Sequence, residues 1–186
     1  VLLKITLTDG INVEQTGGEI ASDLFFDMGF PMSAGDGIEI SREKYEALED
    51  ATALTSAIKK GAELIGFAQN TKKGLVSKLI HRGFSKDISS RAADYLENVG
   101  YIDERTQAEQ LCSELAERRL YGKSRIKNEL YGKGFSDEAI NAAMQLELDF
   151  DAICAERIEK TVNISDFADK VKCRKTVASL MRYGFS

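Results

Sequence analysis

Apolar and polar positions follow two different patterns along this chain, and the first covers about forty residues. In Leu3–Leu7 the two kinds of side chain alternate with the period of a β-strand. Asp9-Gly10 follows as a hairpin turn signal, and Ile11–Val13 is expected to be the returning strand. Gly17-Gly18 reads as a second turn, and residues 20–29 read as a strand or a short helix. The start of the chain is therefore predicted to be a small β-hairpin element.

This N-terminal element is too small for a hydrophobic core of its own. We expect it to pack on the helices that follow or to act as a docking flap. A linker helix begins after Ser41, whose hydroxyl can cap the first turn, and Glu43 lies at the positive end of the helix dipole. Residues 1–50 thus form the predicted N-terminal β element and linker helix.

The rest of the chain has helical periodicity and an internal repeat of about 50 residues. Gly-Phe-Ser occurs three times, beginning at Gly83, Gly134 and Gly184, which lie 51 and then 50 residues apart. A leucine stands four residues before each of these glycines: Leu79, Leu130 and Leu180. Three matches with a common apolar register indicate tandem structural units.

Each unit reads as three helices. Its second helix carries an apolar stripe: Leu75, Leu79 and Ile80 in the first unit, and Ile126, Leu130 and Tyr131 in the second. The glycine ends that helix because it enters the left-handed conformation cheaply, the phenylalanine packs back on the stripe, and the serine caps the next helix. The predicted helices are 54–69, 72–82, 85–98, 104–120, 123–133 and 136–148, with the third unit running from about 151 to 181.

The predicted fold class is mostly α: tandem three-helix repeats that form an elongated curved solenoid. Repeat 1 covers residues 51–100, repeat 2 covers 101–149 and repeat 3 covers 150–186. The sequence stops at Ser186, where the closing helix of repeat 3 should begin. We therefore expect repeat 3 to be incomplete and the chain to be shorter than the natural protein.

Composition argues against several function classes. There is one histidine, and Cys112, Cys154 and Cys173 are far apart without metal-ligand spacing, so we expect buried reduced thiols, no metal and no cofactor. No nucleophile elbow or phosphate loop is present, so an enzyme is not indicated. No apolar run approaches the roughly 18 residues of a membrane span, and the N-terminus lacks signal-peptide features. These features predict a soluble cytoplasmic protein.

The net charge of −5 hides an asymmetry. Residues 1–50 hold 11 acidic and 3 basic residues, whereas residues 51–186 hold 19 acidic and 22 basic residues. The second part can therefore meet an anionic partner, although the acidic total argues against tight binding of naked DNA over the whole surface.

Basic residues concentrate on the second helix of each repeat. In repeats 2 and 3 the candidate binding residues are Arg118, Arg119, Lys123, Arg125, Lys127, Lys133, Lys170, Lys172, Arg174, Lys175 and Arg182. Their charges would attract carboxylates or phosphates. The alternative is a solvated helix face, since Glu114, Glu117 and Glu129 lie close enough to pair with the bases of repeat 2. Tyr121 and Tyr131 can stack on bases or lie in the core.

The second repeat resembles a known family. The motifs are Val99–Glu104, Ala108–Gln110 with Arg118-Arg119, and Tyr121–Leu130 closed by Lys133–Phe135. In order and spacing they are similar to the second repeat of the RecX proteins. The resemblance extends over about residues 54–186 and, more loosely, over the N-terminal β segment.

The resemblance implies a non-enzymatic regulator of the RecA recombinase, acting in DNA repair and recombination. Such a protein would lie in the groove of the RecA–single-stranded DNA filament and modulate filament assembly, ATP hydrolysis and strand exchange, usually by inhibition. We expect a monomer with weak direct DNA binding. The main alternative is a direct DNA-binding protein, because a three-helix unit with a basic helix is similar to a helix-turn-helix domain.

Overall fold

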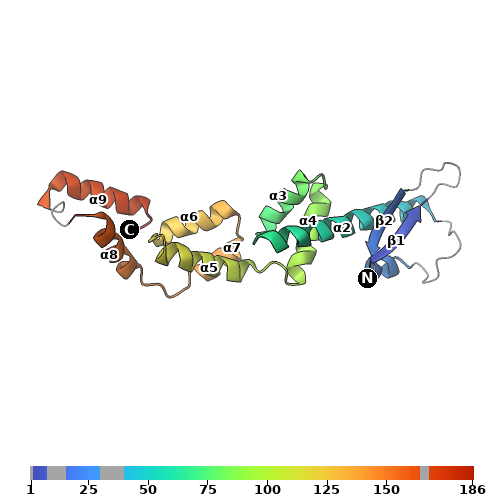
Figure 1. The fold of residues 1–186 in the computed structure, drawn as a ribbon, viewed down its shortest axis with the longest axis horizontal. Helices are drawn as coiled ribbons and strands as arrows, with labels where there is room; N and C mark the ends of the chain where they lie inside the picture. The colour runs from blue at the N-terminus through green and yellow to red at the C-terminus, as the bar shows by residue number, and fades with distance from the viewer. Residues whose placement is uncertain (1, 8–15, 30–39, 164–167) are drawn as a thin grey trace. The chain divides into compact units, whose positions relative to one another are not determined.

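The structure is a computed structural model, and it describes residues 2–7, 16–29, 40–163 and 168–186 of the chain. Within these residues it contains nine helices and one two-stranded sheet (Figure 1). The chain forms two compact units. The first comprises Val1–Asn70 and Gly74–Ile102, and the second comprises Thr71–Lys73 and Asp103–Ser186. Each unit has its own core and is described separately below.

The first unit begins with two antiparallel strands, β1 (Leu2–Leu7) and β2 (Thr16–Ala21). The predicted turn at Asp9-Gly10 and the predicted returning strand over residues 11–13 lie outside the described residues. The predicted turn at Gly17-Gly18 is wrong, because both glycines lie within β2, opposite Thr6 and Ile5 of β1. Backbone pairing overrides the weak strand propensity of glycine at these positions.

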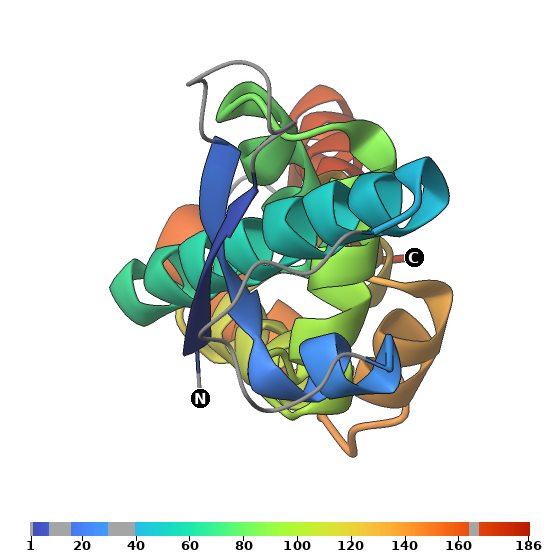
Figure 2. The ribbon, with the colours of Figure 1, turned by 90° about the vertical axis from the view of Figure 1, so that its right-hand side faces the viewer.

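The strand pair packs on the helix that follows it. Ile20 of β2 is fully buried against Leu48 and Ala51 of α2 (Arg42–Phe67), and Phe25 of α1 (Ser22–Asp27) borders the same cluster. Figure 2 shows the strands lying across α2. Of the two roles expected for the β element, packing on the helices is therefore the one that the structure bears out.

Helix α2 begins where the sequence predicts, since Ser41 Oγ accepts a hydrogen bond from the Lys44 amide at 3.3 Å. The predicted linker helix and the predicted helix over 54–69 are, however, one continuous helix of 26 residues. No proline or glycine interrupts residues 42–60, so nothing in the chain ends the helix between them.

Repeat 1 closes with α3 (Lys72–His81) and α4 (Lys86–Asn98). Leu75 and Leu79 of α3 and Leu96 of α4 are fully buried in its core, as the apolar pattern predicts. Ile80, which the sequence analysis assigned to the same stripe, is exposed. One residue turns an α-helix by about 100°, and in α3 this rotation takes Ile80 off the face that buries Leu75 and Leu79.

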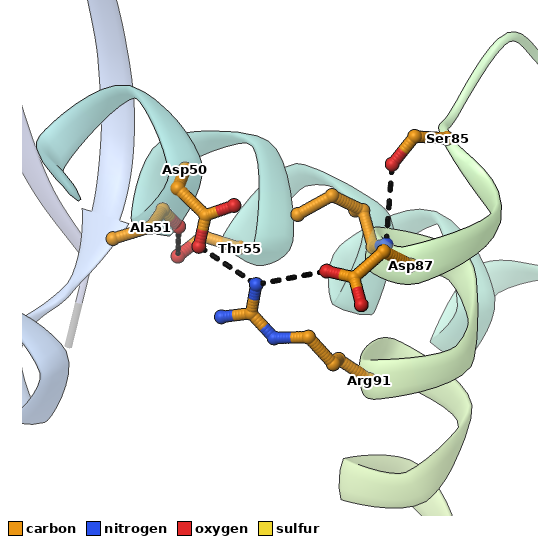
Figure 3. Close-up of polar contacts among 7 residues, drawn as sticks. Asp50, Ala51, Thr55, Ser85, Asp87 and Arg91 are labelled. Carbon is orange, nitrogen blue, oxygen red and sulfur yellow. Dashed lines mark hydrogen bonds and ion pairs between the residues drawn. The ribbon is translucent and has the colours of Figure 1, made fainter. Parts of the chain in front are cut away.

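An arginine on α4 links that helix to α2 (Figure 3). The Arg91 guanidinium contacts Asp50 of α2 at 2.7 Å and Asp87 of α4 at 3.3 Å. The hydrogen bond with Asp50, the largest influence, and that with Asp87 raise the pKa of Arg91. All three side chains are solvent-accessible, and water screens ion pairs of this kind. The network therefore contributes little to the free energy of unfolding, and its main effect is on the orientation of the two helices.

The second unit repeats the arrangement with α5 (Glu104–Glu117), α6 (Lys123–Lys133) and α7 (Asp137–Ala143). Cys112, Ile126 and Leu130 are fully buried in its core, whereas Tyr131 is exposed for the same reason as Ile80. Helix α7 ends at Ala143 and not at residue 148 as predicted. The chain turns there because Leu146 and Leu148 fold back against the core.

The Gly-Phe-Ser turns behave as predicted. Gly83, Gly134 and Gly184 all have positive φ, between 83° and 95°. In each copy the phenylalanine amide donates to the carbonyl of the leucine four residues before the glycine, at 3.1–3.3 Å. Ser85 and Ser136 then accept from the amides of Ile88 and Ala139, which caps α4 and α7. The turn therefore ends one helix and positions the first residues of the next.

Repeat 3 contributes α8 (Phe150–Thr161) and α9 (Lys170–Arg182), neither of which has a buried residue. The expectation of three buried thiols is therefore wrong for Cys154 and Cys173, which are half-buried. Cys112 is buried, and burial raises its pKa to about 11, so its thiol stays protonated at neutral pH and acts as an apolar packing group.

Candidate functional site

The predicted binding residues of repeat 2 lie at the end of α5 and along α6. Arg118 is the C-cap of α5, and Arg119 follows it. Five of the six predicted residues are exposed: Arg118, Arg119, Lys123, Lys127 and Lys133. Arg125 is the exception, since its side chain is about one third exposed.

Lys123 and Lys127 are one helical turn apart on α6, and both residues are exposed. Lys127 Nζ also lies 5.9 Å from the ring centre of Tyr131. Among the described residues, no ion pair joins Lys123 or Lys127 to a carboxylate. Glu129, one of the carboxylates expected to pair with these bases, lies beside Arg125 of the same helix instead.

Arg125 has several partners, of which only Glu129 was expected from the sequence. Its guanidinium carbon lies 4.3 Å from the ring centre of Tyr121 and 5.2 Å from that of Tyr183. Its Nη1 donates to the Arg182 carbonyl at 3.3 Å, and its Nε is 3.6 Å from Glu129. Arg125 therefore joins α6 to the end of α9 and is a packing residue as much as a binding residue.

Arg157 of α8 completes this contact and was missed by the sequence analysis. Its guanidinium carbon lies 3.2 Å from the ring centre of Tyr183, and its Nη1 donates to the Arg119 carbonyl at 3.2 Å. It also donates to the carbonyl of Leu120, whose φ is +51°. These partners are 37 and 38 residues away in sequence, and no local pattern signals such a contact.

The end of α9 is docked on the start of α6 by backbone contacts. The Gly122 amide donates to the Tyr183 carbonyl at 2.7 Å, and Ser124 Oγ donates to the Gly184 carbonyl at 2.8 Å. A Cβ atom at Gly122 would overlap the backbone of Gly184, and one at Gly184 would overlap the backbone of Arg125. The close approach that Gly122 permits in this structure is therefore to the chain's own Gly184.

An equivalent junction lies at the other end of the second unit. Thr71 Oγ1 donates to the Lys133 carbonyl at 3.2 Å, and Lys133 stands in the register position of Tyr183. Glu104 adds a second link. Its carboxylate, in a residue that is 8% exposed, accepts from the Lys72 amide at 2.8 Å and from the Ser136 amide at 3.0 Å. Asp103, the residue before Glu104, caps α5, because its carboxylate accepts from the Thr106 amide at 3.0 Å.

The predicted residues of repeat 3 lie on α9, and all are exposed: Lys170, Lys172, Arg174, Lys175 and Arg182. The acidic residue beside them, Asp169, is the N-cap of α9. Its carboxylate accepts hydrogen bonds from the amides of Val171 and Lys172 at 2.7 and 3.2 Å. No ion pair is formed by Lys170, Arg174, Lys175 or Arg182 within the described part of the chain. This helix therefore presents a strongly cationic surface.

Other kinds of site find little support in the described ranges. No group of three or more histidine, cysteine or carboxylate side chains there is placed to hold a metal ion. One concavity of about 440 Å³ lies over the polar side of α5, lined by Glu109, Glu114, Glu117 and Arg118 among others. No helix of the described residues is long and apolar enough to cross a membrane.

Comparisons with known proteins agree with the repeat architecture. Residues 103–144 match the family model for the second three-helix domain of RecX. Regulatory protein RecX of Chlorobium phaeobacteroides is 28% identical over 137 residues, which cover 74% of this chain and 87% of that protein. Its counterpart from Clostridioides difficile is 27% identical over 128 residues. That match covers 69% of this chain but only 59% of that relative, less than two thirds of its length.

The fold is also similar to a solved structure. A crystal structure of regulatory protein RecX superposes with a TM-score of 0.71, and the match covers 90% of this chain and 82% of that one. The two sequences are 16% identical over the match, so this likeness is evidence for the fold alone.

Proposed function

Because the chain belongs to the RecX family of regulatory proteins, we propose that it inhibits the RecA recombinase by binding in the groove of the RecA–single-stranded DNA filament. Members of this family are regulators and not enzymes. Binding there would slow filament assembly, ATP hydrolysis and strand exchange.

The exposed cations on α6 and α9 are the main support for this proposal. Lys123, Lys127, Lys170, Arg174 and Lys175 make no ion pair within the described residues. A filament offers DNA phosphates and carboxylates, and unpaired cations gain attraction from both without first breaking contacts of their own. Arg118, Arg119, Lys133, Lys172 and Arg182 are the further exposed members of the proposed surface.

The finer shape is also part of the proposal. We propose that the three repeats stack as a monomeric, elongated and curved solenoid that can follow a filament groove. Small-angle X-ray scattering should then give a radius of gyration well above the value of about 16 Å expected for a compact protein of 186 residues. A value near 16 Å would contradict the solenoid but not the family.

The functional test is a titration of this protein into RecA on single-stranded DNA, followed by ATP hydrolysis. We expect the rate to fall at less than one molecule per recombinase subunit. The variant Lys123→Glu with Lys127→Glu should need at least about tenfold more protein for the same inhibition, because each lost phosphate or carboxylate contact weakens a salt-dependent attraction.

The matched control is Arg42→Glu with Lys86→Glu, which changes the net charge by the same amount at exposed positions of α2 and at the start of α4. This control should inhibit like the unchanged protein. If neither protein alters ATP hydrolysis, the proposed function is wrong. Tight binding to one duplex sequence would favour the direct DNA-binding alternative instead.

A further inference from the structure

The second helix of each repeat exposes a large apolar side chain at the same position. Ile80 of α3, Tyr131 of α6 and Met181 of α9 each stand three residues before the glycine of Gly-Phe-Ser. Their exposed fractions are 41%, 46% and 65%. Each follows directly after the leucine that receives the phenylalanine amide of the turn. The position is thus defined by the repeat itself and recurs three times.

For Ile80 and Tyr131, this exposure is not a consequence of loose packing. Leu79 and Leu130, the neighbours of Ile80 and Tyr131, are completely buried, and both repeats have a third helix that covers their core. The side chains of Ile80 and Tyr131 remain outside because the helix turns them away from that core. Tyr131 has a local partner in Asp137, whose hydrogen bond raises the pKa of the tyrosine, but its ring stays accessible.

A cation stands on the same side of each of these helices, nearer its N-terminus. Lys73 is seven residues before Ile80, and Arg174 is seven residues before Met181, a separation of about two turns. Lys127 is one turn before Tyr131. Each of the three cations is exposed, and none forms an ion pair in the described ranges of the chain. The same combination of a basic half and an apolar half therefore occurs in every repeat.

We propose that these helices carry three copies of one docking face whose occupant is a protein surface with an apolar patch bordered by carboxylates. The inference rests on the proposed function, and it assigns this face to the recombinase subunits and not to the DNA strand. Three similar faces suit a partner that is itself built of identical subunits.

The chemistry of the side chains favours protein over nucleic acid. Isoleucine and methionine cannot form hydrogen bonds with base edges or ion pairs with phosphates, and they lack the flat ring that stacks on a base. Their transfer out of water is favourable only against other apolar surface. The neighbouring lysine or arginine would meet a carboxylate at the rim of such a patch, which orients the partner and steers its approach.

The test replaces all three apolar side chains by serine: Ile80→Ser, Tyr131→Ser and Met181→Ser in the full chain. Fluorescence anisotropy would measure binding to RecA filaments on single-stranded DNA and, separately, to the bare oligonucleotide over a series of salt concentrations. We expect the Kd for the filament to rise on the order of 30- to 100-fold. Its salt dependence and the Kd for bare DNA should not change, since no charge is altered.

The matched control is Phe67→Ser, Val99→Ser and Tyr101→Ser, which also removes three exposed apolar side chains, one of them a tyrosine, outside the second helices. Its Kd should equal that of the unchanged protein. Thermal unfolding checks that both triple variants fold. If the first triple variant unfolds at a clearly lower temperature than the unchanged protein, the single variant Met181→Ser replaces it. The Kd of this single variant for the filament should rise about fivefold.

Three results would overturn the inference in distinguishable ways. If the serine variant and the unchanged protein bind the filament with the same Kd, the proposed docking face is wrong, whereas the proposed function still stands. An equal loss of affinity for bare DNA would assign these side chains to nucleic acid. A failure of the unchanged protein to bind filaments would reject the proposed function, and the docking face with it.

Discussion

Replacing Glu104 by alanine should lower the free energy of unfolding of the second unit by about 3 kcal/mol. The carboxylate is buried and accepts two hydrogen bonds from backbone amides, those of Lys72 at 2.8 Å and Ser136 at 3.0 Å. A hydrogen bond to a charged group contributes about 1.5–3 kcal/mol, and its loss leaves both amides without this acceptor. The two amides are 64 residues apart in sequence. One side chain therefore joins two segments that are distant along the chain.

Chemical denaturation monitored by circular dichroism would measure this change. Glu104→Gln should lose roughly half as much, since the amide keeps one oxygen as an acceptor but has an NH₂ group where the second oxygen was. Glu114→Ala is the matched control on the same helix, because Glu114 is exposed and alanine is a good helix former. A loss at Glu104 no larger than at Glu114 would contradict the assigned role.

Replacing Gly184 by alanine should undock the end of α9 from α6. Gly184 has a φ of +93°, which costs a residue with a side chain about 1 kcal/mol. An added Cβ would also overlap the backbone of Arg125 and lie 2.8 Å from the Gly122 carbonyl oxygen. Backbone atoms cannot move aside as a flexible side chain can, so we expect a total cost of about 3 kcal/mol or more.

Amide hydrogen exchange would locate the effect. The amides of Gly122 and Ser124 donate to the Tyr183 and Gly184 carbonyls, and their protection should fall by on the order of 100-fold in the variant. Gly132→Ala is the control, because Gly132 lies in α6 with no atom within 4 Å of a built Cβ. That change should raise stability by up to about 1 kcal/mol. Unchanged protection at Gly122 would show that the turn accommodates the methyl group.

The local structure of the repeats could be predicted because its causes are local. A glycine in the left-handed conformation, a serine that caps the next helix and a leucine four residues before the glycine act through contacts within one or two turns. Gly83, Gly134, Ser85 and Ser136 therefore behave as the pattern indicates. The N-terminal strands were less predictable, since Gly17 and Gly18 adopt β structure only because β1 pairs with them.

The candidate site could be predicted by residue type but not by role. All of the basic residues lie where the helical pattern places them, yet nothing local separates Lys123, which is exposed and makes no ion pair among the described residues, from Arg125, which packs between Tyr121 and Tyr183. The difference arises from α9, more than 40 residues away in sequence. Arg157 was missed for the same reason, since the carbonyls that it contacts, those of Arg119 and Leu120, belong to another repeat.

By itself, the sequence determined the helical class, the repeat with its turns, and the resemblance to the RecX proteins, because periodicity, caps and motifs are properties of neighbouring residues. Only the tertiary structure decided which cations are exposed, that Glu104 joins Lys72 to Ser136, and that Gly122 and Gly184 meet backbone to backbone. These outcomes depend on distances between segments far apart in the chain, and packing, not local preference, sets such distances.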